Sequence, residues 1–269
     1  MPVISLLTDF GLSDTYVGIM KGVILSRAPE ARIVDISHGI LPQHLVKAAF
    51  LIDSAYRYFP KGTVHVVVVD PGVGSDRTII VLEAAGYFFM APNNGVLTMI
   101  LEKTTAAKAV KVENRRFFLE TVSRTFHGRD IFAPVAAYLS LGGDIHELGS
   151  RVAPSDLMRL PIPKPLIGKT GELIGVVIDI DRFGNLITNI NEDLIQALCE
   201  NSGPAVIVGI GGNRICDLKA SYADVSPGAT LAIIGSRGTL EISINRGRAK
   251  DFFSAAIGDQ VTVLTGDRF

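Results

Sequence analysis

Strand-length runs of β-branched residues alternate with segments of helical spacing over the first 160 residues, and this alternation constrains the fold more than any other feature. VISLLT, ARIVDIS and VHVVVV are predicted strands, and TIIVLEAAG and YFFMAP continue the series. Residues 14–27, 45–58, 94–103 and 129–141 are predicted helices. Strands that alternate with helices imply βαβ units, so we expect an α/β domain with a mostly parallel sheet flanked by helices.

The pattern changes at a proline-rich stretch. RLPIPKPLIGKTG is typical of a linker, because its prolines break regular structure. Beyond it, short strands follow one another with Gly, Asn and Asp between them, and only residues 193–201 have helical spacing. We therefore predict an α/β domain over residues 1–160, a linker over 161–168 and a small all-β domain, a barrel or compact sandwich, over 169–269.

The composition excludes several classes of protein. The chain has 269 residues, 48% of them hydrophobic, which is enough to bury a sizeable core. Its formal net charge is -1, so the chain lacks the excess of Lys and Arg that is typical of nucleic-acid-binding proteins. The first residues lack the basic region of a signal peptide, and no apolar run approaches about 18 residues. We expect a soluble cytoplasmic protein in which Cys199 and Cys216 are buried, reduced thiols.

Common cofactor and nucleophile motifs are absent from the sequence. The glycines after the first and third strands do not form G-x-G-x-x-G, so a nicotinamide or flavin enzyme is disfavoured. Neither a P-loop nor a G-x-S-x-G elbow occurs. His38 and His44 lie six residues apart and are a weak metal signal. We expect no cofactor and no metal site.

Charged residues follow the predicted strands at the positions where ligands usually bind. Asp9 ends the first strand, and Asp14 follows soon after. Asp70 ends the third strand in the block DPGVGSDR, which continues to Arg77, and His127 precedes a predicted helix. Open α/β sheets bind ligands beyond the carboxyl ends of their strands, so these side chains are candidates for one site.

Each candidate also has a structural explanation. Asp70 can bond its own backbone in a turn. Arg77 can form a surface ion pair, and His127 can adjoin a helix cap. Asp9 and Asp14 can each cap the first helix, and Asp14 stands where an N-cap is expected.

Taken together, six blocks resemble a known family. TDFGLSDTYVGIMKG, DPGVGSDR, APNNGVLT, FHGRDIFAP, DRFGNLITNI and SRGTLEISINRG occur in order across nearly the whole chain. They are similar to blocks of the S-adenosylmethionine hydroxide adenosyltransferases, the hydrolase relatives of the fluorinase and chlorinase.

The resemblance implies hydrolysis of S-adenosylmethionine to adenosine and methionine, through attack of water or hydroxide on the 5′ carbon of the ribose. The family's catalytic Asp, Arg and His fall by motif on Asp70, Arg77 and His127. Halogenating members have other residues in the Asp and His places, and the fluorinase carries an insertion before the APNNG block. The interval from Arg77 to Ala91 is short here, so the chain departs from the halogenases on both counts.

The resemblance also implies substrate-binding residues in both domains. In the first domain, Asp9 is expected to bond the ribose hydroxyls, Asp14 to support the same loop, and Asn93 and Asn94 either to position the loop or to form a structural turn. In the second domain, the residues expected at the methionine end or the adenine are Asp181, Phe183, Asn185, Ser236 and Arg237, with a core position as the alternative for Phe183. Family members form homotrimers whose sites lie between subunits, so a homotrimer is expected here.

Three other functions remain open at this point. The first is a halogenase, which Asp70 and His127 disfavour. The second is a metal-dependent phosphoesterase with Asp9, Asp70 and His127 as ligands. The third is a protein that binds S-adenosylmethionine or a nucleoside with little turnover, because the same pocket can bind without fast chemistry.

Overall fold

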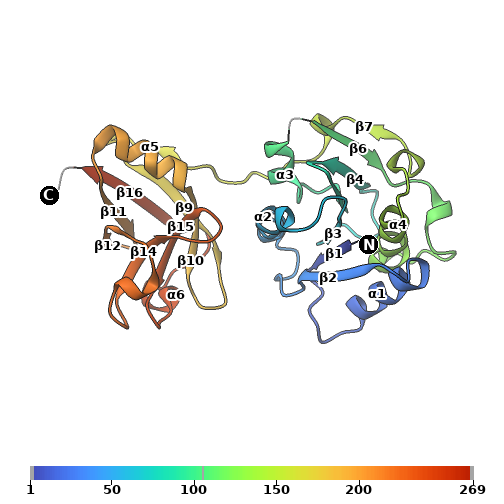
Figure 1. Ribbon diagram of the computed structural model, residues 1–269, viewed down its shortest axis with the longest axis horizontal. Helices are drawn as coiled ribbons and strands as arrows, with labels where there is room; N and C mark the ends of the chain where they lie inside the picture. Colours follow the sequence, from blue (N-terminus) through green and yellow to red (C-terminus); the bar gives the residue numbers. More distant parts are fainter. Residues whose placement is uncertain (1–2, 105, 267–269) are drawn as a thin grey trace. The chain divides into compact units, whose positions relative to one another are not determined.

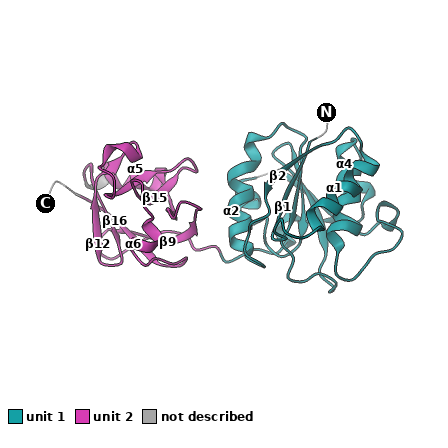
Figure 2. Ribbon diagram, turned by 90° about the horizontal axis from the view of Figure 1, so that it is seen from below, with its two compact units in different colours: residues 1–161 teal, residues 162–269 magenta. Residues whose placement is uncertain are grey.

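A seven-stranded sheet forms the centre of the first of two units (Figure 1). The structure is a computed structural model that describes residues 3–104 and 106–266. The units are Met1–Pro161 and Ile162–Phe269 (Figure 2). The strands of the first unit are β1 (Val3–Thr8), β2 (Arg32–Ser37), β3 (Val64–Val68), β4 (Ile79–Ala84), β5 (Tyr87–Pro92), β6 (Ala107–Lys111) and β7 (Arg151–Val152).

The first sheet has the order β2-β1-β3-β5-β4-β6-β7 and is mixed. The strands β2, β1, β3 and β5 run parallel, whereas β4 is antiparallel to β5 and β6, and β6 is antiparallel to β7. The α/β prediction is confirmed, and the parallel arrangement holds for the half of the sheet around β1. The reversal follows from Ala85 and Gly86, whose φ angles of 52° and 81° form a two-residue hairpin turn between β4 and β5.

Helices cover both faces of this sheet. They are α1 (Tyr16–Arg27), α2 (Leu45–Ala55), α3 (Thr98–Lys103), α4 (Ala133–Ser140), the π-helix η3 (Gly128–Phe132) and the 3₁₀ turns η1 (Tyr56–Tyr58), η2 (Arg115–Phe117), η4 (Ile145–Glu147) and η5 (Pro154–Asp156). One face packs against α1 and α4 and the other against α2 and α3, so two apolar clusters sandwich the sheet (Figures 1 and 2). Each helix predicted in this unit is present: α1, α2 and α3 are shorter than predicted, and the fourth consists of η3 followed by α4.

The start of α1 differs from the prediction. The helix begins at Tyr16, and Thr15 occupies the N-cap position without a side-chain hydrogen bond to the helix. Asp14 is exposed and does not cap the helix, and Asp9 instead accepts a hydrogen bond from the backbone of Gln43. The capping explanation is therefore wrong for both carboxylates, because the loop after β1 continues for longer than the spacing of apolar residues indicates.

The second unit is a barrel-like sheet that is nearly closed. Its elements are β8 (Leu166–Ile167), β9 (Leu173–Ile180), β10 (Leu186–Asn191), α5 (Glu192–Ser202), β11 (Ala205–Ile210), β12 (Asn213–Cys216), β13 (Leu218–Lys219), η6 (Tyr222–Asp224), β14 (Thr230–Ile234), β15 (Thr239–Ile244), α6 (Ala249–Phe252) and β16 (Gln260–Gly266). The strand order is β12-β11-β16-β9-β10-β15-β14-β13, with β8 paired to β9, and contacts between β12 and β14 bring the ends of this order together. The predicted barrel is therefore confirmed.

Both cysteines are free, but they are less buried than predicted. Cys199 on α5 is half-buried and Cys216 on β12 is exposed. Cys216 lies at the end of a strand in which only Ile215 is buried, so its side chain falls on the outer face. Among the described residues, no helix combines the length and apolar character needed to cross a membrane.

Candidate active site

Two carboxylates follow the C-terminal ends of neighbouring parallel strands, at the same edge of the first sheet. The strands β1 and β3 are paired with Thr8 opposite Val68, and the chain continues from them to Asp9 and to Asp70. Ligands of open α/β sheets bind at this edge. Two of the sequence-predicted residues of the first unit, Asp9 and Asp70, therefore come from adjacent strand ends.

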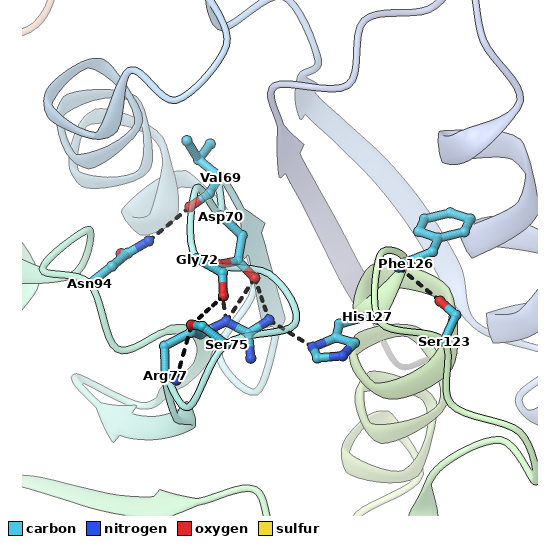
Figure 3. Close-up of polar contacts among 9 residues, drawn as sticks. All are labelled: Val69, Asp70, Gly72, Ser75, Arg77, Asn94, Ser123, Phe126 and His127. Atoms are coloured by element: carbon cyan, nitrogen blue, oxygen red, sulfur yellow. Dashed lines mark hydrogen bonds and ion pairs between the residues drawn. The ribbon is translucent and has the colours of Figure 1, made fainter.

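Asp70 is held by Arg77 rather than by its own turn. The Nε atom of Arg77 donates to Oδ1 and Oδ2 of Asp70 at 3.0 and 2.9 Å, and its Nη2 atom also contacts Oδ2 (Figure 3). The side chains of Asp70 and Arg77 are 5% and 12% exposed. This is a largely buried, multiply bonded ion pair, which differs from both structural explanations considered for these residues.

His127 lies on the other side of the same guanidinium group. The Nη2 atom of Arg77 is 2.8 Å from Nδ1 of His127 (Figure 3). Arginine can only donate, so Nδ1 is the acceptor and the proton of the neutral ring lies on Nε2. Burial, reinforced by the charge of Arg77, lowers the pKa of His127 below its usual value. The imidazole is therefore neutral near pH 7, and Arg77 joins it to Asp70.

The DPGVG turn is shaped by the segment that carries His127. Gly74 has a φ angle of +78°, and a Cβ atom there would lie 2.3 Å from the backbone oxygen of Arg124. Only glycine permits both this conformation and this close approach. The turn after β3 and the loop before η3 are therefore in direct contact.

Asn94 supports the strand end from the opposite side. Its Nδ2 atom donates to the carbonyl of Val69 at 2.9 Å (Figure 3). Its Oδ1 atom accepts from the backbone of Val96. Asn93 accepts from the backbone of Met158. Both asparagines make structural bonds, and the bond from Asn94 fixes the residue that precedes Asp70.

His38 holds the loop that contains Asp9, a role that sequence reasoning missed. Its Nδ1 atom is 2.8 Å from Oγ1 of Thr8, and its carbonyl accepts from the backbone of Gly11 at 2.9 Å. Its Nε2 atom lies 3.1 Å from Oδ1 of Asp35. The signal available in the sequence was the block DISH at the end of the second strand. His38 is only 4% exposed, and His44 caps α2 by accepting from Lys47.

An aromatic cluster that sequence reasoning also missed lies beside His127. The ring of Phe126 is 6.2 Å from that of Phe10 and 5.0 Å from that of Tyr16. These aromatic contacts join the Asp9 loop and α1 to the segment before η3. Asp14, in the same loop, is exposed.

The five site residues predicted in the second unit line one pocket. This pocket has a volume of about 620 Å³, and its walls include Asp181, Phe183, Asn185, Ser236 and Arg237. Phe183 is 73% exposed, so it is not a core residue. The pocket walls also include Tyr222, Glu241, Arg246 and Arg248, which sequence reasoning did not select.

Three of the predicted polar residues of the pocket, Asp181, Asn185 and Arg237, are already paired. Both oxygens of Asp181 accept from Asn185, one from its backbone nitrogen and one from its Nδ2 atom, each at 2.9 Å. Arg237 donates from Nη1 to the buried carboxylate of Asp179 at 2.9 Å. These bonds orient side chains around the pocket without a ligand.

Two of the residues considered as metal ligands, Asp70 and His127, converge on a guanidinium group. Within residues 3–104 and 106–266, no three His, Cys, Asp or Glu side chains are arranged to hold a metal ion. Asp70 and His127 both direct their polar atoms toward the cation of Arg77. This arrangement does not support the metal-dependent phosphoesterase.

Comparison with known proteins identifies the family. Residues 4–149 match the SAM hydroxide adenosyltransferase N-terminal domain and residues 175–262 match the C-terminal domain. The chain is 37% identical to the (R)-S-adenosyl-L-methionine hydrolase of Salinispora tropica, over 98% of both chains, and 28% identical to the fluorinase of Nocardia brasiliensis, over 98% of this chain and 97% of that protein. It resembles the crystal structure of an uncharacterized conserved protein from Thermotoga maritima, with a TM-score of 0.90, 39% identity and coverage of 97% and 99% of the two chains. The chain belongs to the SAM hydroxide adenosyltransferase family.

Proposed function

We propose that this protein hydrolyses S-adenosyl-L-methionine to adenosine and L-methionine. The observation that carries the proposal is the guanidinium group of Arg77, held between the carboxylate of Asp70 and the neutral imidazole of His127 at a strand end. The full-length relatives of 34–37% identity are named (R)-S-adenosyl-L-methionine hydrolase, which supports the same activity.

The difficult part of this reaction is the activation of the nucleophile, water. Water forms a bond from its oxygen to C5′ of the ribose, and the C5′–S bond breaks with its electron pair going to sulfur. Methionine leaves as a neutral thioether, so the leaving group needs no proton. Bulk water has a pKa of about 15.7, so the enzyme must favour loss of a water proton.

The cluster in the first unit suits this demand. Arg77 stays protonated, and its charge stabilises the developing hydroxide. Asp70 is the proposed proton acceptor, because it is a carboxylate largely removed from bulk water. His127 holds Arg77 in place through Nδ1 and offers a neutral ring beside the water. In-line attack also requires a fixed water, and the bonded strand end provides rigid support.

The remaining predicted residues are proposed to bind substrate. Asp9 accepts the ribose hydroxyls, since one of its oxygens is fixed by Gln43, and Asp14 supports the same loop. In the second unit, the pair of Asp181 and Asn185 and the block Ser236-Arg237 hold the methionine end, and Phe183 packs on the substrate. Asn94 acts indirectly by positioning the end of β3.

The proposal extends to cofactors, assembly and location. We propose that the reaction needs neither metal nor cofactor, and that the protein acts in the cytoplasm. We further propose a homotrimer whose sites combine the first unit of one subunit with the second unit of the next. The placement of the nucleophile cluster and of the binding pocket on different units supports this assembly. A ring of identical subunits repeats one heterologous interface and closes on itself.

Two other functions are weaker candidates. A halogenase is suggested by the fluorinase relatives, but the carboxylate of Asp70 disfavours a halide anion at the same place. A binding protein with little turnover would use the same pocket without needing the Asp70–Arg77–His127 cluster.

One experiment separates these functions. The purified protein is incubated with S-adenosyl-L-methionine in oxygen-18 water, with and without a chelator, and the products are analysed by mass spectrometry. We expect the label in the 5′ hydroxyl of adenosine, and activity that survives chelation. A halogenated nucleoside formed when halide is added, label in a methionine-derived alcohol, or loss of activity that a divalent metal restores would contradict the proposal.

A further inference from the structure

Asp130 is a buried carboxylate in η3, three residues after His127. The side chain is fully buried, and no step of the proposed reaction uses it. Its Oδ1 atom accepts from Nε of Arg129 at 2.6 Å, and its Oδ2 atom accepts from Nη2 of Arg129 at 3.1 Å. Oδ2 also accepts from the backbone nitrogen of Ser123 at 2.8 Å. One oxygen of this carboxylate is therefore bonded to the loop that precedes His127.

This loop, residues 119–127, is held by Asp130 at two points. In addition to the bond between its side chain and Ser123, the backbone carbonyl of Asp130 accepts from the backbone of Leu119 at 2.9 Å. Oγ of Ser123 in turn accepts from the backbone nitrogen of Phe126 at 2.9 Å (Figure 3). Hydrogen bonds through Ser123 thus connect the buried carboxylate to the end of the loop.

The loop supplies His127 and also contacts the turn after β3. A Cβ atom on Gly74 would collide with the carbonyl oxygen of Arg124, so the turn packs directly on the loop. The same turn continues to Arg77, which is bonded to both Asp70 and His127. The position of the loop therefore sets where the imidazole lies relative to the guanidinium group.

Asp130 also acts on His127 through its charge. Burial, followed by the charge of Arg77, lowers the pKa of His127. The charges of Asp70 and Asp130 and a hydrogen bond with the backbone of Ser123 act in the opposite direction. Burial by itself would raise the pKa of Asp130, but the hydrogen bonds that this carboxylate accepts bring its pKa below the usual value. The carboxylate is therefore charged near pH 7.

We propose that Asp130 is a positioning residue that fixes the loop through Ser123 and thereby holds His127 in place for the reaction. This inference rests on the proposed function and assigns a role to a residue outside the predicted set. A buried N–H group that loses its acceptor is unfavourable, so the loop shifts if the carboxylate is altered. Such a shift slows the chemical step more than it weakens substrate binding, because the rate depends steeply on the geometry of the reacting groups.

The test uses Asp130→Asn, which keeps the size of the side chain but removes its charge. One acceptor oxygen becomes an NH₂ group, so either the backbone nitrogen of Ser123 or the guanidinium group of Arg129 faces a donor. We expect kcat for S-adenosyl-L-methionine to fall by about 10-fold and KM to change by less than about 2-fold. An NMR titration should show the pKa of His127 shifted further below its usual value, because a negative charge that favours the protonated ring is lost.

Asp53→Asn is the matched control, because Asp53 on α2 of the same unit is also a buried carboxylate with a cationic partner, Lys103. It should leave kcat, KM and the pKa of His127 unchanged, and thermal melting checks that both variants fold. The proposal is overturned if Asp130→Asn leaves kcat near the wild-type value, acts mainly on KM, or leaves the pKa of His127 unchanged. Equal changes in Asp53→Asn would overturn it too, because they would show a general effect of losing a buried charge.

Arg129→Met decides the question if Asp130→Asn does not fold. Arg129 is partly exposed, and the substitution removes both bonds from its guanidinium group to Asp130. We expect kcat to fall by about 3-fold with KM unchanged. Unchanged kcat, or an effect on KM alone, would overturn the proposal. The titration of His127 needs no turnover, so a failure of the proposed reaction is visible separately in the wild-type products.

Discussion

The Nη2 atom of Arg77 lies 2.8 Å from Nδ1 of His127, and the same nitrogen contacts Asp70. One cation is therefore shared by an acid and a base that are 57 residues apart in the chain (70 to 127). Burial and, after it, the charge of the guanidinium lower the pKa of His127, and the same guanidinium neutralises Asp70. The following predictions test what each part of this arrangement contributes.

Asp70→Asn keeps the shape of the side chain but removes its charge. Turnover of S-adenosyl-L-methionine should fall by roughly 100-fold or more if Asp70 accepts the water proton, while substrate affinity changes much less. Steady-state kinetics with product chromatography measures both. Asp76→Asn is the control, because Asp76 is exposed in the same turn. Turnover of Asp70→Asn near the wild-type value would mean that Asp70 is only structural.

Arg77→Met should raise the pKa of His127. Burial is the largest cause of the lowered pKa and stays, but the repulsion from Arg77 disappears and the attraction of Asp70 remains. An NMR titration of the imidazole resonances measures the change. Arg124→Met removes an exposed cation from the loop before His127 and should leave its pKa unchanged. A lowered pKa in Arg77→Met would contradict the geometry.

His38→Ala should weaken substrate binding more than it slows chemistry. The substitution removes the bond to Thr8 that anchors the loop of Asp9, so KM should rise by about 10-fold while kcat changes little. His38→Asn places an acceptor near the position of Nδ1 and should restore part of the affinity. If the fold-changes in KM caused by Asp9→Asn and His38→Ala simply multiply in the double variant, the two residues do not act together.

His65 should make the protein less stable in acid. It is fully buried, its Nδ1 atom is 2.6 Å from Oγ of Ser5, and burial lowers its pKa from 6.5 to about 4. The unfolded chain binds a proton between these values and the folded chain does not. The stabilisation is therefore complete above pH 6.5 and is lost as the pH falls to about 4, by about 3 kcal/mol.

Urea unfolding at several pH values measures this effect. His65→Leu should flatten the dependence of the unfolding free energy on pH between 6.5 and 4, whatever it does to stability at pH 8. An unchanged slope in this variant would show that other groups cause the acid sensitivity.

Mixed oligomers test whether sites are shared between subunits. Asp70→Asn and Asp181→Ala should each be nearly inactive, because each damages a different unit. Refolding them together should restore part of the activity if the intact first unit of one subunit works with the intact second unit of the next. No recovery in verified mixed oligomers would reject the shared site.

Local patterns in the sequence were enough to predict most elements. The first five residues of VHVVVV form β3, because an almost continuous β-branched run fits a strand buried on both faces. The boundary between the two compact units follows Pro161 in the sequence. It lies where the pattern changes from alternating strands and helices to strands with few helices. The six blocks also indicated the family and the residues to inspect, including Asp70, Arg77 and His127. These signals are readable because they depend on neighbours within a few residues.

Tertiary structure decided what those residues do. No spacing in the sequence shows that Arg77 reaches His127, that His38 holds Thr8, or that Asp181 is already bonded to Asn185. Strand periodicity places Glu241 and Ser243 on one face of TLEISI, but only the tertiary structure brings Tyr222 against the carboxylate of Glu241 beside a pocket. Burial and charge pairing depend on residues that the fold brings together from distant parts of the chain. The free energy of a charged side chain depends on the polarity and the charges of all these neighbours.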